Sequence, residues 1–278
     1  MARTVTTLIG DASVSIITDG EKEFGPEVFA GTAPEHIAAL LQAAGASTIK
    51  TNFNAVLIQH AGRVILADAG LRDLAGPECG HLGEGLSELG VTADQVDTLL
   101  ATHLHPDHIA GMITPDGAAV FANAQLHVAQ AECEFWSEDT NFQGAAAGLA
   151  NNAKLAQAVL AAYGDRLVIL ADGAEVAPGL SGLALPGHTP GHFGWRLDSG
   201  GASLINVGDI VHAPALQMAD PEIAISFDLD IPTARDTRKR LLDMLASDGT
   251  LFTGGHFLHP AFNRVARKGQ GYELIAAG

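Results

Sequence analysis

One ten-residue run constrains this chain more than any other feature: it reads ATHLHPDHIA and spans Ala101 to Ala110. Three histidines and one aspartate in it follow the spacing H-x-H-x-D-H, namely His103, His105, Asp107 and His108. Imidazoles and carboxylates crowded together are costly to bury unless a cation holds them, and zinc and its neighbours accept both donor types. The run follows the apolar stretch Val96–Leu100, which predicts a buried strand, so these side chains are expected on a loop at a strand end. A solvated histidine-rich loop is the competing interpretation.

The composition is that of a globular protein with an excess of acidic residues. The 278 residues are 47% hydrophobic and 17% charged, and their formal net charge is −17. Such a charge repels nucleic acid and anionic membranes, so neither is an expected partner. The N-terminal stretch lacks the apolar core of a signal peptide, so we expect a cytoplasmic location, or a periplasmic or secreted one if a leader has been removed. Cys79 and Cys133 are expected as free thiols, with a single disulfide left open.

Short apolar runs and helical repeats alternate along the chain, and no linker divides it. Runs rich in Val, Ile and Leu predict strands at residues 14–18, 55–59, 64–67, 98–101, 126–128, 167–170, 182–185 and 203–207. Apolar residues at helical spacing predict helices at residues 34–44, 129–136, 145–163 and 233–245. The charges of the last helix, Arg238 among them, are expected on a solvated face. We therefore expect one layered α/β domain over residues 1–278, with helices outside two sheets.

Three further metal-ligand residues follow apolar runs later in the chain. His188 lies in the turn PGHTPGH, Asp209 ends the run LINVGD, and His256 follows the sequence TGG. Each residue alone fits a structural role. Together with the first run they make seven candidate ligands at strand ends, a repetition that a structural role does not explain.

These seven residues, in this order, resemble the signature of the metallo-β-lactamase superfamily, H-x-H-x-D-H followed by a later His, Asp and His. Asp68, in VILADAG, is similar to the family's upstream strand, Asp and Gly motif. The resemblance runs from about Asn52 to the C-terminus and implies a four-layer αββα sandwich, two mixed β-sheets flanked by helices. Residues 1–50 would then be an N-terminal extension that serves as a lid or as a dimer contact.

Within the superfamily, the chain resembles the methyl parathion hydrolase-like branch, near the quorum-quenching lactonases. The supporting segments are AQAECEFW at 129–136, GHTPGH at 187–192, GDIVH at 208–212 and RKGQGY at 267–272. This resemblance implies a homodimer that hydrolyses neutral esters, lactones or organophosphotriesters. A glyoxalase II-like thioesterase or a β-lactamase-type hydrolase on the same metal centre is the alternative. An iron-binding redox relative and a silent binding module are less favoured.

Carried over residue by residue, the resemblance implies two divalent metal ions, with zinc as the first choice and manganese, iron or cobalt as alternatives. The first ion would be held by His103, His105 and His188. The second would be held by Asp107, His108 and His256, and Asp209 would bridge the two. Two ions can share a hydroxide and stabilise an oxyanion transition state. Asp107 is a candidate catalytic residue because its carboxylate would help to orient that hydroxide.

Histidines outside this set have separate expected roles. His212 follows Asp209 by three residues, where many lactonases of the family carry a tyrosine; it is a candidate acid or hydrogen-bond donor to the substrate, with a packing role left open. His192 is expected to be structural or to fix a ligand, and His259 competes with His256 as a ligand. The others are expected on the surface or in strands: His36, His60, His81 and His127.

Aromatic residues supply the candidate substrate contacts. Trp136 ends a predicted helix that, by resemblance, borders the pocket, with core packing as the equal alternative. The segment from Phe24 to Phe29 contains Gly and Pro and is expected to expose both rings over the site. Besides histidine, residues 101–194 hold only two basic residues, which disfavours phosphodiester and nucleic-acid substrates because these need cationic clamps.

Overall fold

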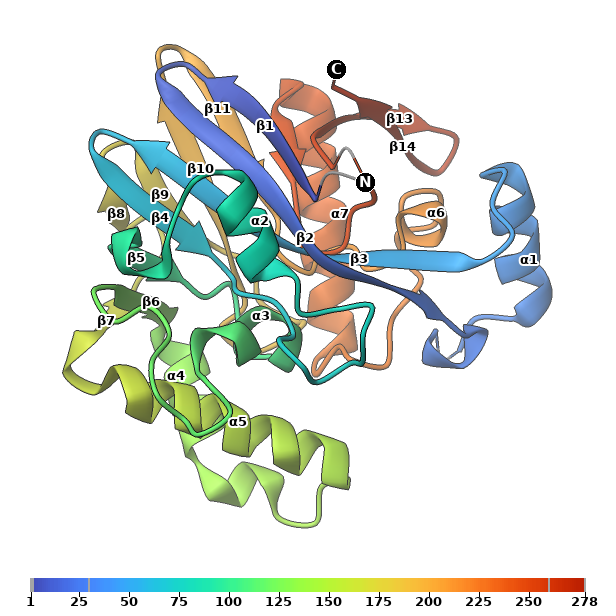
Figure 1. The fold of residues 1–278 in the computed structure, drawn as a ribbon. Helices are drawn as coiled ribbons and strands as arrows, with labels where there is room; N and C mark the ends of the chain where they lie inside the picture. Colours follow the sequence, from blue (N-terminus) through green and yellow to red (C-terminus); the bar gives the residue numbers. More distant parts are fainter. Residues whose placement is uncertain (1–2, 30, 260, 278) are drawn as a thin grey trace.

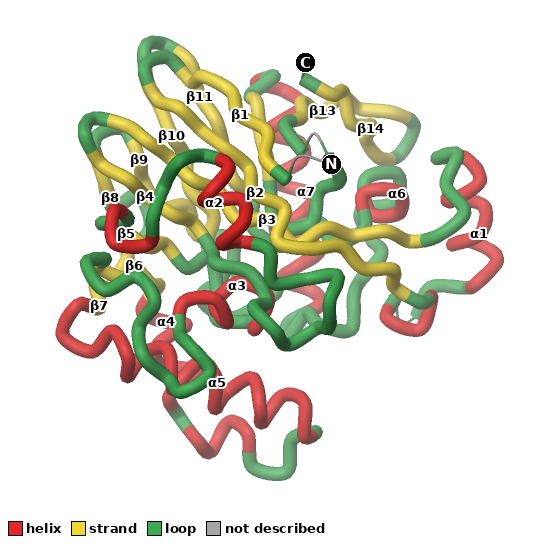
Figure 2. Tube along the Cα trace, in the orientation of Figure 1, coloured by secondary structure: helices red, strands yellow, loops and turns green. Residues whose placement is uncertain are grey.

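A computed structural model describes residues 3–29, 31–259 and 261–277. They form two seven-stranded sheets with helices on their outer sides (Figures 1 and 2). The first sheet contains, in both chain and spatial order, β1 (Thr4–Ile9), β2 (Ala12–Phe24), β3 (Ile49–His60), β4 (Arg63–Ala67), β5 (Thr98–Leu100), β6 (Gln125–Ala129) and β7 (Leu167–Leu170). The second contains, again in order, β8 (Glu175–Ala177), β9 (Leu180–Ala184), β10 (Phe193–Ser199), β11 (Ala202–Asn206), β12 (Leu251–Thr253), β13 (Asn263–Lys268) and β14 (Gly271–Ala276).

Alternating side chains of the strands fill two cores. Ile16 and Ile58 point into the space between the sheets, where they join Trp195 of the second sheet. The neighbours Ile17 and Leu57 belong instead to the core beneath the outer helices of the first sheet. Because successive side chains of a strand point to opposite faces, a run that is apolar at every position needs cover on both sides. The four-layer αββα sandwich expected from the sequence is confirmed.

The helices are α1 (Pro34–Ala43), α2 (Leu82–Glu88), α3 (Pro106–Ile109), α4 (Gln130–Ser137), α5 (Ala147–Tyr163), α6 (Pro214–Gln217) and α7 (Ile231–Asp248). Single 3-10 turns lie at Pro26–Val28, Ala93–Gln95, Ala110–Met112, Asp139–Phe142 and Gly164–Arg166. Helices α4 and α5 pack together over the first sheet, and α7 packs Leu241 and Leu245 against the second. The expectation for Arg238 is wrong, because this side chain on α7 is buried, with 1% of its surface exposed.

The N-terminal segment is part of the sandwich rather than an appendage to it. Residues 4–24 form β1 and β2, so the expected extension over residues 1–50 is wrong for this part. Strand β2 pairs with β3 as far as Phe24 opposite Ile49, and the resulting long ribbon reaches α1 at the far side of the molecule (Figure 1). There Phe29 packs in a small core with Ile37 of α1 and Leu216 of α6.

Every expected strand and helix overlaps an observed one. The sequence patterns did not predict β1, β10, α2 or the C-terminal hairpin of β13 and β14. Both cysteines are free thiols, Cys79 buried and Cys133 partly buried. In the described part of the chain, none of the helices has the length and apolar character needed to span a bilayer.

Candidate metal centre

The candidate ligands follow the ends of strands in both sheets. Parallel strands β4 and β5 end side by side, and β5 leads into the H-x-H-x-D-H run. Parallel strands β11 and β12 end side by side in the second sheet and lead to Asp209 and His256, while β9 leads to His188. The carboxyl ends of neighbouring parallel strands lie at one edge of a sheet, which is where open α/β folds place their sites. The two sheets thus bring ligand types from distant parts of the sequence together.

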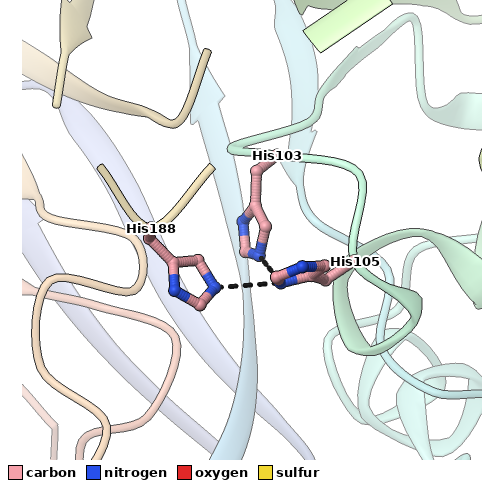
Figure 3. A group of neighbouring side chains, drawn as sticks. All are labelled: His103, His105 and His188. Carbon is pink, nitrogen blue, oxygen red and sulfur yellow. Dashed lines mark hydrogen bonds between the residues drawn. The ribbon is translucent and has the colours of Figure 1, made fainter. Parts of the chain in front are cut away.

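Three imidazoles form the first group. Nδ1 of His105 lies 3.0 Å from Nε2 of His103 and 2.9 Å from Nε2 of His188 (Figure 3). All three residues are buried. Burial lowers the pKa of His103 and of His105 well below the ordinary value, so these rings are neutral, the form that binds a metal ion.

A second group consists of Asp107, His108, Asp209 and His256. Oδ2 of Asp107 lies 3.5 Å from Nε2 of His108 and 3.6 Å from Nε2 of His256. The side chain of Asp107 is 20% exposed, whereas the other three are buried. Of the seven expected ligands, Asp107 is therefore the one that solvent reaches most easily.

Asp209 joins the two groups through a single oxygen. Its Oδ2 lies 3.6 Å from Nε2 of His103 and 3.5 Å from Nε2 of His188 in the first group. In the second group it lies 3.2 Å from Nε2 of His108 and 2.9 Å from Nε2 of His256. Burial alone would raise the pKa of Asp209, but the surrounding imidazoles outweigh burial and hold that pKa well below its usual range.

The outward ring nitrogens are already occupied by acceptors. Nδ1 of His188 lies 2.9 Å from Oδ1 of Asp228, Nδ1 of His256 lies 2.8 Å from the carbonyl of Asn52, and Nδ1 of His108 lies 2.9 Å from Oδ2 of Asp68. When the ring is neutral, such partners keep the proton on the outward nitrogen and leave a lone pair on the inward one. Converging imidazole lone pairs and carboxylate oxygens are the donor set of a borderline divalent cation.

Other features of the cluster also fit a bound cation. Oδ1 of Asp209 is buried and has no hydrogen-bond partner within residues 3–29, 31–259 and 261–277. A Cβ at Gly255 would lie 2.6 Å from that oxygen, so only glycine leaves it this space. Burial would lower the pKa of His108 and of His256, but the carboxylates of Asp209 and Asp107 outweigh it and raise both. A cation would displace those protons on binding.

Residues that the sequence patterns did not single out contact the segments that carry the candidate ligands. Glu132 is wholly buried and accepts the N–H of Leu104 on Oε2 at 3.0 Å and that of Gly191 on Oε1 at 2.9 Å. It thereby joins the loop of His103 and His105 to the turn that follows His188. Only the segment AQAECEFW hinted at this carboxylate. The sequence offered no signal for the roles of Asn52 and Asp228.

The histidines with undecided roles are separated by their surroundings. His192 is buried, and its Nε2 accepts the backbone N–H of Asp209 at 2.9 Å. His259 is exposed, whereas His256 lies in the cluster. His212 is buried with Nε2 at 3.3 Å from Oδ2 of Asp209, and its ring stacks on that of His256 at 4.7 Å. Its Nδ1 has no partner in the described part of the chain.

The expected aromatic contacts divide into buried and accessible residues. Trp136 is fully buried and donates from Nε1 to Oε2 of Glu132 at 2.7 Å. Its ring also packs edge-on against that of His105, a candidate ligand. Phe29 is also fully buried, and the expectation of an exposed ring is wrong because the ring fills the core beside α1 and α6. Phe24 is partly exposed, and its ring lies 5.9 Å from that of Phe227, a residue absent from our predictions.

An αββα sandwich with this His/Asp cluster at its edge defines a metal-dependent hydrolase. The chain belongs to the metallo-β-lactamase superfamily, whose family model matches residues 52–256. The resemblance inferred from the motifs is thereby confirmed. Comparison with curated proteins found no match.

Solved structures of the superfamily cover nearly the whole chain. The hydrolase AbOPH is 28% identical, with a TM-score of 0.92 over 100% of this chain and 98% of its own. AidC, described as a dizinc quorum-quenching lactonase in complex with a homoserine product, is 24% identical, with a TM-score of 0.93 over 99% and 97%. A quorum-quenching N-acyl homoserine lactone lactonase is 18% identical, with a TM-score of 0.63 over 93% and 100%. The likeness to the two lactonases concerns the fold.

Proposed function

We propose that the protein is a binuclear metal-dependent hydrolase of neutral esters, lactones or organophosphotriesters. The observation that carries the proposal is the position of Oδ2 of Asp209. This oxygen lies 2.9–3.6 Å from imidazole nitrogens of both groups, so it could bind an ion in each. His103, His105 and His188 would hold one ion, Asp107, His108 and His256 the other, and Asp209 both. When bound, divalent ions would supply Lewis acidity and lower the pKa of water at the site. Zinc is the first choice, with manganese, iron or cobalt as alternatives.

The chain's own residues would position the reactants. Burial would raise the pKa of Asp107, but His108 and His256 outweigh it and hold that pKa below the ordinary range. The partly exposed carboxylate is therefore ionised and can accept a hydrogen bond from water. His212 is neutral at pH 7, since burial lowers its pKa to about 4, so it can donate one N–H to a substrate oxygen.

The proposed substrate class follows from the rim of the cluster. Phe227 is 42% exposed and its ring lies 6.4 Å from that of His212, so an apolar surface borders the ligands. Within residues 101–194, Arg166 donates to the carbonyls of Phe121, Ala122 and Ala124 and not to the cluster. A polyanionic substrate would find no cationic clamp there, whereas a neutral ester, lactone or phosphotriester needs none.

Metal analysis with a substrate panel tests this proposal. We expect about two zinc ions per chain, and Asp209→Ala and His256→Ala should each lower the hydrolysis rate by orders of magnitude. The panel contains an aryl ester, acyl-homoserine lactones, methyl paraoxon, nitrocefin and a glutathione thioester. Activity confined to the last two, or one or no zinc ion at saturation, would refute the proposal. A homodimer, which we also propose, is tested by sedimentation.

A further inference from the structure

Arg238 is a buried cation close to the metal centre. It lies in the middle of α7 with 1% of its surface exposed. A buried guanidinium is costly unless its donors are satisfied, and here each nitrogen has a partner. Nε donates to the carbonyl of Ile210 at 2.6 Å, and Nη1 donates to the carbonyls of Pro221 and Ile223 at 2.9 Å each. Nη2 lies 3.5 Å from Oδ2 of Asp228.

These partners lead directly to two candidate ligands. The other oxygen of Asp228, Oδ1, lies 2.9 Å from Nδ1 of His188. The segment after Asp228 is also tied to the His188 turn, since Leu229 donates its N–H to the carbonyl of His188 at 3.0 Å. Ile210 is the residue that follows Asp209 in the chain. One guanidinium therefore contacts both the carboxylate behind His188 and the carbonyl of the residue that follows Asp209.

We propose that Arg238 is a positioning residue of the metal centre, acting through Asp228 on His188 and through the Ile210 carbonyl on Asp209. The inference rests on the proposed metal site and adds a role that the sequence motif does not contain. A carboxylate behind a ligating imidazole fixes its tautomer and its ring orientation, and loss of such a partner costs about 10–100-fold in metal affinity or activity. The rigid guanidinium fork suits this position because its three nitrogens point at acceptors on different sides, whereas the donors of a lysine ammonium share one nitrogen.

A purely structural role is the alternative. Arg238 could simply anchor the Pro221–Asp228 segment to α7, in which case its loss would destabilise the fold and leave metal affinity unchanged. Asp228→Asn separates the two roles, because it removes the charge behind His188 and leaves the three carbonyl contacts of Arg238 in place. Arg240, an exposed arginine on the same helix, provides the matched control.

The test is zinc affinity of the full chain, measured by competition with a chromophoric chelator, alongside urea unfolding of the metal-free protein. We expect Arg238→Met, Arg238→Lys and Asp228→Asn each to lower the affinity for one of the two zinc ions about 10–100-fold. The double variant Arg238→Met with Asp228→Asn should lose no more zinc affinity than the more affected single variant. The reason is that the two residues act in one chain of contacts. Arg240→Met should match the wild type.

Two results would overturn the inference. One is zinc affinity within twofold of wild type in both Arg238→Met and Asp228→Asn, whatever the stability of the metal-free protein. The other is a fully additive double variant. If Arg238→Met does not fold, Asp228→Asn and Arg238→Lys decide the question by the same criterion. Failure of the wild type itself to bind two zinc ions refutes the proposed metal centre instead, so the two failures are distinguishable.

Discussion

Nε2 of His192 accepts the backbone N–H of Asp209 at 2.9 Å. His192 is not one of the seven candidate ligands, but it contacts the backbone of one of them. Its other nitrogen, Nδ1, lies 2.8 Å from the carbonyl of Leu185 and carries the proton. Gly208, at φ 53°, leaves room for the ring, because a Cβ there would collide with Nε2. The imidazole therefore fixes the turn that presents the shared carboxylate.

His192→Leu should both destabilise the protein and weaken metal binding. It leaves the buried N–H of Asp209 without an acceptor, which costs about 1–3 kcal/mol. It also removes a contact that fixes the turn of this proposed ligand. His192→Gln is the matched control, since its amide oxygen can take the place of Nε2. Urea unfolding and zinc competition provide the measurements. Equal zinc affinity in both variants and the wild type would contradict this role.

Glu132→Gln should lower stability although it changes the side chain very little. Oε2 accepts from Leu104 and from Trp136, and Oε1 accepts from Gly191, so an amide NH2 would face an N–H donor at either position. We expect a loss of about 1–3 kcal/mol in the free energy of unfolding. Glu134→Gln on the exposed face of α4 is the control. A similar small change in both variants would show that Glu132 does not tie the two ligand loops together.

Most strands and the residues of the His/Asp cluster could be predicted from the sequence because both leave local patterns. β3 contains the apolar run AVLI and β11 ends on SLIN, and four of the seven candidate ligands lie within residues 103–108. β10 was missed because its sequence FGWRLDS includes glycine and charges. It is a strand because it pairs with β9 on one side and β11 on the other. That pairing depends on the order of strands in the sheet and not on the residues of β10 alone.

The residues behind the ligands could not be predicted in the same way. Asn52 contacts His256, which lies 204 positions away in the sequence, and Asp228 contacts His188, which lies 40 positions away. No local periodicity therefore encodes either contact. Arg238 was misplaced for a related reason: a charge between other charges on a helix predicts a solvated face. Buried carbonyl acceptors from two other segments change that preference, and they exist only in the folded chain.

Phe227→Ala should weaken substrate binding more than it slows the reaction. The ring is 42% exposed beside Phe24 and His212 and makes none of the contacts that hold the ligands. Loss of its apolar surface should raise KM about tenfold for a lactone with a long acyl chain, with kcat nearly unchanged. Leu8→Ala, an exposed apolar residue on β1, is the control. A fall in kcat at constant KM would place Phe227 in the reaction instead of at the rim.

His212→Phe should affect substrates according to their leaving groups. The alkoxide that leaves from a lactone develops more negative charge on its oxygen than a nitrophenolate does, so it gains more from the N–H that neutral His212 can donate. Loss of one such donor costs about 10²–10³-fold in rate. We therefore expect a large loss of kcat on an acyl-homoserine lactone and a small one on methyl paraoxon. Zinc content must be measured in parallel, because His212 lies 3.3 Å from Oδ2 of Asp209. Unchanged rates on both substrates would assign the ring to packing.

His127 on β6 should make stability depend on pH independently of the metal centre. Burial, and then the charge of Arg63, lower the pKa of this imidazole below its ordinary value. The unfolded chain, with a His pKa of about 6.5, then binds the proton more tightly than the folded one. Stability should fall as pH drops through about 6.5 and level off below the pKa of the folded state.

Urea unfolding between about pH 7.5 and pH 5 tests this. Over that range His127→Leu should lose less stability than the wild type, because it lacks the imidazole. His259→Leu, at an exposed position, should follow the wild type. Parallel curves for His127→Leu and wild type would show that the His127 pKa does not change on folding.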